Sequence, residues 1–335
     1  MRWFPTAVAV VLIVVEGCGV VMADSNFLEV VTFNTAFGGS YVADGRAKVE
    51  RAVLDYATRN PVNWHLIALQ ETFWNDTTEE LLRRLNNRTG RSWSFVQSQG
   101  AALFTDGAIQ SDGFHRSDSR PNMGDVGAVL SFNNGRDAIL AWSLHLQPFP
   151  YGPYGVCRGD ERLSVYKIER ATRLMDLRSI LDHVVFRLVR KRDRIPIMLL
   201  GDFNSPSHQD RQVPTDEKIA PACRQRREMR GYHDVFRESH PPTTHPGYTW
   251  SPMLKRSNEF GREPQDRIDM IWYRNPRGRD RRRTKLCPGP RLPEVDTGNR
   301  WRTRPIVDML EPNWSATNEW PSDHAAVLAQ FRLRC

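Results

Sequence analysis

Residues 197–204 read Ile-Met-Leu-Leu-Gly-Asp-Phe-Asn, so a short apolar run stops at two polar side chains, Asp202 and Asn204. A run of this length that is bounded by a turn signal is typical of a buried β-strand. Because side chains alternate along a strand, we expect Asp202 and Asn204 to share one face, with Phe203 turned into the core. The sequence therefore predicts a buried sheet whose strand ends carry polar groups.

The same arrangement recurs along the chain. Strands are predicted over 27–33, 66–69, 126–132, 138–146, 195–200, 268–273 and 325–331, and the polar residues at their ends are Asn34, Glu71, His145, Asp269 and the pair Asp323-His324. Asn134-Gly135 predicts a hairpin between two of these strands. Interleaved strands and helices indicate a mixed α/β protein.

Helices are predicted in three places. Residues 44–59 have helical spacing, with Val49, Val53 and Tyr56 on one side, and residues 161–190 fit one long helix. The Thr77–Glu80 stretch matches a capping box that opens a helix through Leu85. Two regions lack periodicity, so residues 205–264 are expected to form loops and the polar, Gly-rich residues 100–122 show no strand pattern.

The N-terminus predicts a secretory signal peptide. Arg2 precedes the apolar run Ala7 to Val15, and the small-residue pattern ending at Ala23 predicts cleavage there. That run is too short to span a bilayer, which requires about 20 residues, and no later segment is long enough. We therefore expect a signal peptide over 1–23, one secreted domain over 24–335, no transmembrane segment and a monomer. A bacterial lipoprotein box ending at Cys18 is the alternative for the leader, although Glu16 fits it poorly.

Four cysteines remain after cleavage: Cys157, Cys223, Cys287 and Cys335. In an exported chain they indicate two disulfides, and the absence of a Cys-x-x-Cys pair argues against a zinc or redox site. Because Cys287 follows one predicted strand and Cys335 ends another, we favour Cys287–Cys335 with Cys157–Cys223. Asn75, Asn87 and Asn313 begin triplets that are candidate glycosylation sites if the host is eukaryotic, in which case the chain is expected to be a glycoprotein.

The net charge of +8 is concentrated in residues 274–304, which hold eleven lysines or arginines and three acidic residues. A basic segment of this kind usually accompanies a polyanionic partner. Since it begins directly after the strand that carries Asp269, we expect part of it to lie at the rim of the site. A solvated loop that serves solubility is the alternative.

Six short stretches, taken together, resemble the endonuclease/exonuclease/phosphatase superfamily. They are Thr32-Phe33-Asn34, Leu69-Gln70-Glu71, Ser143-Leu144-His145-Leu146, Gly201-Asp202-Phe203-Asn204, Arg267-Ile268-Asp269 and Ser322-Asp323-His324, in the order of that superfamily. The resemblance implies a four-layer sandwich, in which two packed β-sheets are flanked by helices and the active site lies at one edge. It also implies that 24–335 is a catalytic domain, similar to poorly characterised secreted members.

The resemblance implies roles for these residues that physical chemistry supports. Glu71 would bind Mg²⁺ or Mn²⁺, with Asn34 beside it and Asp323 on or near the metal, because hard cations prefer oxygen ligands. Asp202 and His324 are both candidates for orienting or deprotonating the attacking water, and Asp269 would hold the His324 imidazole. Asn204 and His145 would donate hydrogen bonds to the phosphoryl oxygens.

The leading hypothesis is a secreted, metal-dependent phosphodiesterase that acts on nucleic acid. A phospholipid phosphodiesterase of the sphingomyelinase type is the rival, favoured by the aromatic residues Phe149, Tyr151 and Tyr154 but lacking a long apolar hairpin. Another phosphodiester or a small phosphoester is a further possible substrate. A binding module on an inactive scaffold is disfavoured because all four carboxylates are present. No acid can be placed behind His145, which argues against a mechanism with two catalytic histidines.

Overall fold

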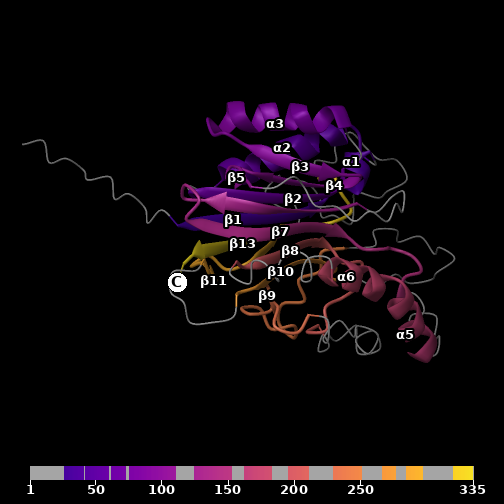
Figure 1. Ribbon diagram of the computed structural model, residues 1–335. Helices are drawn as coiled ribbons and strands as arrows, with labels where there is room; N and C mark the ends of the chain where they lie inside the picture. The colour runs from indigo at the N-terminus through magenta and orange to yellow at the C-terminus, as the bar shows by residue number, and fades with distance from the viewer. Residues whose placement is uncertain are drawn as a thin grey trace, which may run out of the picture.

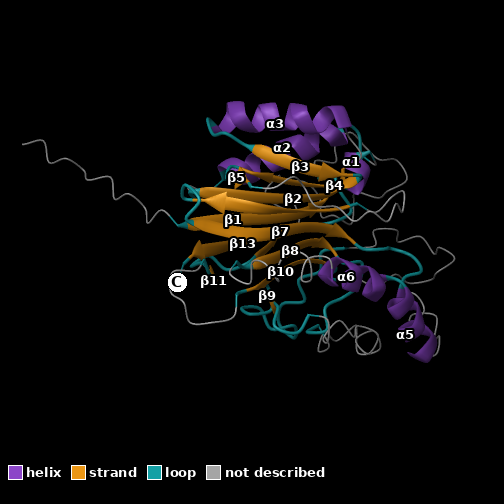
Figure 2. Ribbon diagram, in the orientation of Figure 1, coloured by secondary structure: helices purple, strands orange, loops and turns teal. Residues whose placement is uncertain are grey.

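Two β-sheets pack face to face in the computed structural model of the chain, and helices cover their outer faces (Figure 1, Figure 2). This confirms the predicted sandwich. The structure describes residues 26–40, 42–59, 62–72, 75–110, 124–152, 162–182, 195–210, 229–250, 266–276, 284–296 and 320–334. No helix in these ranges combines the length and the apolar character needed to span a bilayer.

The first sheet has seven strands in the order β11-β13-β1-β2-β4-β3, with β12 also paired to β13. Its strands are β1 (Phe27–Asn34), β2 (Trp64–Thr72), β3 (Ser94–Ser98), β4 (Gly100–Thr105), β11 (Leu286–Pro288), β12 (Glu294–Asp296) and β13 (Ala326–Leu333). The second sheet has six strands in the order β5-β6-β7-β8-β10-β9. These are β5 (Ala108–Ile109), β6 (Asp125–Phe132), β7 (Asp137–His145), β8 (Ile197–Asp202), β9 (His233–Asp234) and β10 (Asp269–Arg274).

Three apolar clusters hold the layers together. The cluster between the sheets includes Leu28, Leu66, Ala128 and Met198. A second cluster packs α2 (Gly45–Thr58) and α3 (Asn75–Thr89) on the first sheet, and α2 buries Val49, Val53 and Tyr56 as predicted. The third packs α6 (Arg173–Asp182) on the second sheet, and Leu177, Ile180, Trp142 and Leu199 belong to it. Two short helices, α1 (Ala36–Gly39) and α5 (Arg162–Ala171), complete the described elements.

Both sheets are built around a parallel pair of strands. In the first sheet β1 is parallel to β2 and antiparallel to β13, and in the second sheet β7 is parallel to β8, which is antiparallel to β10. The C-terminal ends of each parallel pair therefore lie beside the N-terminal end of its antiparallel neighbour. This topology brings the polar residues that end β1, β2, β7 and β8 and those that begin β10 and β13 to one edge of the sandwich.

Several local predictions were wrong. Residues 100–105 form β4, which is buried on both faces, and its alanines lack the β-branched character that marks a strand. The predicted long helix is two helices, α5 and α6, separated at Thr172, although the backbone hydrogen bonds from Thr172 N–H to the Ile168 carbonyl and from Asp176 N–H to the Thr172 carbonyl are kept at 3.1 and 3.0 Å. The third helix begins at Asn75 and continues to Thr89, beyond the predicted limits. Residues 183–190 and much of 205–264 lie outside the described residues.

Candidate active site

The polar residues predicted at the strand ends meet at the edge of the sandwich. Asn34 ends β1, His145 ends β7 and Asp202 ends β8, while Glu71 lies in the last residues of β2. Asp269 begins β10, and Asp323 and His324 lie just before β13. The side chains of Asp202 and Asp269 are buried, whereas that of Asp323 is 27% exposed.

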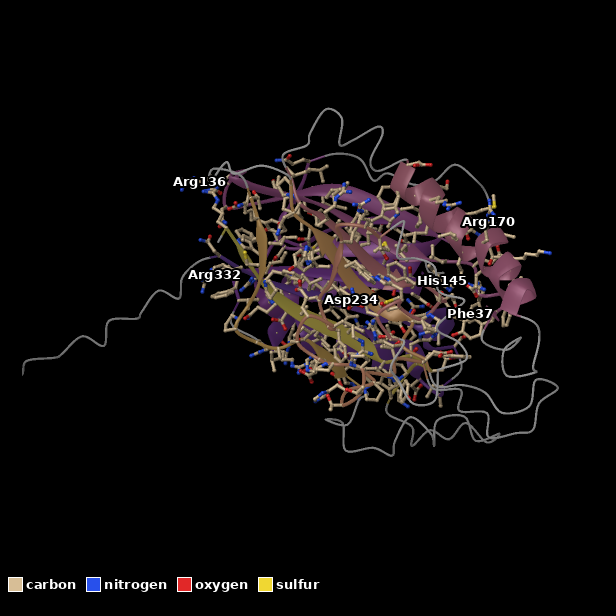
Figure 3. The ribbon with its side chains drawn as sticks, turned by 90° about the horizontal axis from the view of Figure 1, so that it is seen from below. Phe37, Arg136, His145, Arg170, Asp234 and Arg332 are labelled. Atoms are coloured by element: carbon tan, nitrogen blue, oxygen red, sulfur yellow. The ribbon has the colours of Figure 1, made fainter. Side chains whose placement is uncertain are left out.

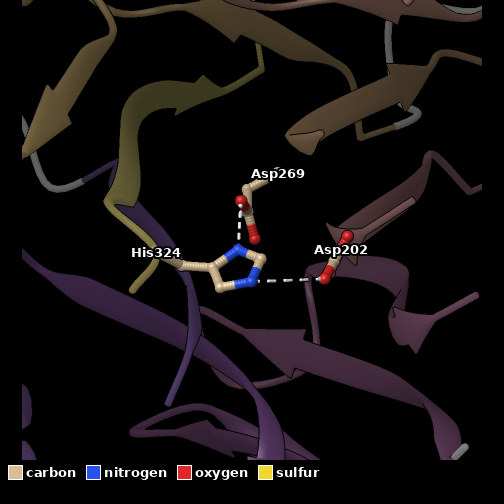
Figure 4. A group of neighbouring side chains, drawn as sticks. All are labelled: Asp202, Asp269 and His324. Carbon is tan, nitrogen blue, oxygen red and sulfur yellow. Dashed lines mark hydrogen bonds and ion pairs between the residues drawn. The ribbon is translucent and has the colours of Figure 1, made fainter. Parts of the chain in front are cut away.

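His324 lies between two buried carboxylates (Figure 4). Its Nδ1 lies 2.8 Å from Asp269 Oδ2 and its Nε2 lies 3.8 Å from Asp202 Oδ2. Burial alone would lower the pKa of His324, but the Asp269 carboxylate, followed by Asp323, raises that pKa well above its usual value. The geometry therefore matches the predicted role of Asp269 as the group that holds the imidazole.

The pKa of Asp202 is set by its burial and by the charged residues around it. Burial, followed by the nearby Asp269, raises the pKa of Asp202 to about 6, against the opposing effect of the His324 and His145 imidazoles. Its Oδ1 accepts the backbone N–H of Asn204 at 2.7 Å, and its Oδ2 accepts Asn34 Nδ2 at 3.0 Å. These contacts fix both oxygens of a carboxylate that can take up a proton.

The backbone around this group is closely packed. Gly201 has φ +144°, and a Cβ added there would lie 2.0 Å from the Leu144 carbonyl oxygen, so β7 and β8 approach closely just before Asp202. Thr249 Oγ1 accepts the N–H groups of Ile268 and Asp269 at 3.0 and 2.9 Å. Trp250 forms an isolated bridge to His324.

Glu71 occupies a less regular position. It has φ +58°, and the pairing of β2 with β4 shifts register between Gln70 and Thr72. Its carboxylate accepts Asn34 Nδ2 at 3.0 Å and the backbone N–H of Phe37 at 3.0 Å. Burial raises the pKa of Glu71 despite the nearby His324 imidazole. A positive φ at a residue other than glycine marks backbone strain that surrounding contacts must hold in place.

His145 and Asn204 both lie at this edge, but with different contacts. His145 Nε2 lies 3.7 Å from Glu71 Oε1 and 3.7 Å from Asp202 Oδ2. Its buried Nδ1 has no hydrogen-bond partner among the described residues, so no carboxylate there supports this ring. Burial lowers the pKa of His145 and favours the neutral imidazole. The Asn204 side chain donates to the Leu146 carbonyl at 2.9 Å, which engages one of its two amide hydrogens with the backbone.

The residues at this edge fit a hard divalent cation. Carboxylate oxygens of Glu71 and Asp323 are the ligands that Mg²⁺ prefers, and the two groups lie close enough for Asp323 to raise the pKa of Glu71. A second candidate set, Asp202, Asp269 and His324, has ligand atoms within 4.8 Å of one another. In that set His324 Nδ1 and Asp269 Oδ2 lie 2.8 Å apart and already engage each other.

Asn34 lies directly beside Glu71, and its role next to a metal stays a prediction. Its Oδ1 accepts the Ala36 N–H at 3.0 Å, and its Nδ2 is directed at the carboxylates of Glu71 and Asp202. In this arrangement Asn34 holds the carboxylates of Glu71 and Asp202 together.

The sequence analysis missed several supporting residues. Ser322 Oγ donates to the Asn34 carbonyl at 2.7 Å and accepts the His324 N–H at 3.0 Å, so it joins the two strand ends. Thr249 and Trp250 come from a stretch without periodicity, and a pattern based on strands gives no signal for them. Ser322 was visible as the residue before Asp323-His324.

The basic segment begins at the end of β10 away from Asp269, and the expectation that part of it lies at the rim stays a prediction, because residues 277–283 and 297–304 lie outside the described residues. In the pairing of β10 with β8, Asp269 lies opposite Asp202 but Arg274 lies opposite Ile197, at the other end of the strand. Five residue steps along a strand place these ends about 17 Å apart. Arg274 lies over the Tyr232 ring at 4.8 Å. Arg281, Arg282 and Arg283 lie outside the described residues, so the role expected for them stays a prediction.

A profile described as "Endonuclease/Exonuclease/phosphatase family" matches residues 31–324. The chain therefore belongs to this family of phosphoric ester hydrolases, and the predicted resemblance is confirmed. A protein of Caenorhabditis elegans, described as uncharacterized, is 29% identical over 327 residues, which cover 92% of this chain and 92% of that protein.

Solved structures share the fold at low identity. Truncated Caenorhabditis elegans TDP2 matches with a TM-score of 0.53 and 14% identity, covering 91% of this chain and 98% of that one. D. rerio TDP2 complexed with a single-strand DNA product gives 0.53 and 14%, covering 91% and 99%. An AP endonuclease from Archaeoglobus fulgidus gives 0.52 and 17%, covering 90% and 98%. At these identities the likeness is one of fold.

Proposed function

We propose that the chain is a secreted, Mg²⁺- or Mn²⁺-dependent phosphodiesterase that cleaves nucleic acid. The observation that supports this most is the placement of His324 between Asp269 and Asp202, at 2.8 and 3.8 Å, on the same edge as Glu71. Such a group supplies a proton acceptor, a positive charge and a metal ligand at one edge of the sandwich.

Asp202 is the better candidate for the group that takes the proton from water. Its pKa of about 6 keeps it largely ionised at neutral pH, and two hydrogen bonds fix its oxygens. The raised pKa of His324 suits the opposite role, in which a protonated imidazole faces the negative phosphoryl oxygens. Asp269 keeps that imidazole in place through its 2.8 Å contact with Nδ1.

Glu71 and Asp323 would hold the metal, which when bound polarises the phosphoryl oxygen and stabilises the leaving oxygen. Asn34 keeps Glu71 and Asp202 together through its amide nitrogen. His145, neutral because of its burial, and the second amide hydrogen of Asn204 are the remaining hydrogen-bond donors for a phosphate.

Two features favour nucleic acid as the substrate. The net charge of +8 favours a polyanion. The fold is shared with an AP endonuclease and with a TDP2 whose structure holds a single-strand DNA product. We expect the enzyme to act as a monomer.

Phospholipid hydrolysis is the second candidate, because Phe149 is 60% exposed. Tyr151 argues against it, since this residue is buried and its hydroxyl donates to Asp266, so the loop does not present both rings to a membrane. Tyr154 lies outside the described residues.

Export is proposed from the leader, which lies outside the described residues together with Cys157, Cys223 and Cys335. Cys287 is disulfide-bonded, which supports an oxidising compartment. In the sheet, Cys287 lies opposite Arg332, three residues before Cys335, and this register favours a Cys287–Cys335 pair. The pairing itself stays a prediction. Glycosylation also stays a prediction.

Parallel assays test this proposal. The mature chain, stripped with EDTA and then supplied with Mg²⁺ or Mn²⁺, should cleave DNA or RNA and should leave sphingomyelin intact. Full activity in EDTA would contradict the metal dependence, and cleavage of sphingomyelin alone would favour the lipid candidate.

A further inference from the structure

Phe149 presents an aromatic ring to solvent four residues after the site residue His145. Its side chain is 60% exposed, although large aromatic side chains are usually buried. In the described part of the chain, the other large apolar side chains with this degree of exposure are Phe37, Met175 and Leu292.

The backbone on both sides of Phe149 is held by a buried arginine. Arg173, 1% exposed, donates through Nη1 to the carbonyls of Gln147 and Pro148 at 2.9 and 3.1 Å, and through Nη2 to that of Pro150 at 2.7 Å. Its charge is matched by Glu169, which accepts Arg173 Nε at 2.8 Å. A buried ion pair is costly unless its hydrogen bonds are made, and here three of them fix the loop that carries an exposed ring.

The start of this loop is joined to the strand that carries Asp202. The Leu146 N–H donates to the Asp202 carbonyl at 2.9 Å, and Asn204 Nδ2 donates to the Leu146 carbonyl at 2.9 Å. The loop therefore leaves β7 directly at the candidate active site.

The end of the loop returns to the other side of the site. The Tyr151 hydroxyl donates to Asp266 Oδ2 at 2.5 Å, and the Tyr151 ring meets the Trp250 ring edge-on at 5.7 Å. Trp250 bridges to both Asp266 and His324. The loop that carries Phe149 is thus anchored at both ends. Leu146 is hydrogen-bonded to Asp202 and Asn204, and Tyr151 contacts Asp266 and Trp250.

Phe37 is a second exposed aromatic residue beside the site. Its side chain is 45% exposed, and its backbone N–H donates to Glu71 Oε2 at 3.0 Å. Figure 3 shows Phe37 next to His145, at the end of the molecule away from Arg136 and Arg332. Glu71 links the two, because its other carboxylate oxygen lies 3.7 Å from His145 Nε2.

We propose that Phe149, together with Phe37, stacks on nucleobases next to the scissile phosphate. The preferred substrate is then a phosphodiester with an unpaired base beside the bond that is cut, as in single-stranded nucleic acid. This inference rests on the proposed function and adds a substrate class to it. A fixed loop favours stacking on a single base, since the backbone that carries the ring is held before binding. A membrane would require a broader apolar surface than one ring beside the buried Tyr151.

The test compares two single-stranded oligonucleotides with Mg²⁺, one intact and one lacking the bases on both sides of the scissile phosphate. The wild type should cleave the intact strand with a kcat/KM at least about tenfold higher, the scale of one stacking contact. Phe149→Ala should lose about tenfold on the intact strand and little on the abasic one. Phe149→Trp should keep the preference, and the matched control Leu292→Ala, which removes a side chain that is 63% exposed, should behave as the wild type.

Other outcomes overturn the inference in distinguishable ways. Equal losses on both strands for Phe149→Ala would show a structural role, and no loss on either would show that the ring does not contact substrate. Weaker binding to vesicles of sphingomyelin and phosphatidylcholine, with unchanged oligonucleotide cleavage, would assign Phe149 to a lipid surface. If the wild type cleaves neither strand, the proposed function itself fails.

Discussion

The two sheets reach the active-site edge in different ways. In the second sheet, Asp202 ends β8 in regular register with His145 and Asp269, and its side chain is 1% exposed. In the first sheet, Glu71 lies at a shift in strand register, with φ +58° and a side chain that is 13% exposed. One carboxylate is therefore fixed by regular pairing, and the other is turned by a local irregularity.

This difference separates two tasks. Burial raises the pKa of both carboxylates, and for Asp202, the more deeply buried of the two, the pKa reaches about 6, which suits a group that exchanges a proton. A carboxylate that binds a hydrated cation needs access to water, because Mg²⁺ usually keeps several water ligands. We therefore propose that the second sheet carries the carboxylate that takes up the proton, and that the first sheet carries the metal ligands together with His324.

The largest expected effect is on turnover. Glu71→Gln, Asp202→Asn and His324→Ala should each lower kcat by at least about a hundredfold, the scale of losing an acid–base or electrostatic group. Raising the Mg²⁺ concentration should partly restore Glu71→Gln and should leave Asp202→Asn unchanged, which sharpens the division between the sheets. Glu80→Gln, a change on the outer helix α3, is the control and should be fully active. Equal rescue of Glu71→Gln and Asp202→Asn by Mg²⁺ would contradict the assignment of metal binding to Glu71 and proton transfer to Asp202.

An intermediate effect is expected on stability. Gly201→Ala should lower the free energy of unfolding by about 2 kcal/mol or more, because a Cβ there would lie 2.0 Å from the Leu144 carbonyl oxygen. Gly135→Ala is the matched control, since Gly135 also has a positive φ, +80°, but has nothing within 4 Å of the added Cβ. We expect about 1 kcal/mol there. Urea denaturation measures both, and equal losses would show that β7 and β8 do not approach as closely as described.

The smallest effect is expected for the residue that positions His324. Asp269→Asn should lower kcat by about tenfold, because it removes the charge that holds the imidazole while leaving a side chain of the same shape. Because the two residues act as a unit, combining it with His324→Ala should add little to the loss of the single variant. A fully additive double variant, measured by steady-state kinetics, would show that Asp269 acts independently of the imidazole.

The sequence predicted the strand ends that form the site because each apolar run stops at a chemically distinct residue. It did not predict β4, whose alanines carry little strand signal, or the division of the long helix at Thr172, where no proline or glycine marks a boundary. The orientation of Asn34 could not be predicted either, because it depends on which groups surround the amide. The start of the basic segment lies at the end of β10 away from Asp269, because a strand carries the chain from one edge of the sheet to the other.

The most direct test of this division is the binding of Mn²⁺, followed by electron paramagnetic resonance on the EDTA-treated protein without substrate. The wild type and Asp202→Asn should bind one Mn²⁺ with similar affinity, whereas Glu71→Gln should bind at least about tenfold more weakly. If Asp202→Asn loses the ion and Glu71→Gln keeps it, the metal belongs to the Asp202, Asp269 and His324 group, and the assignment of the two sheets is wrong.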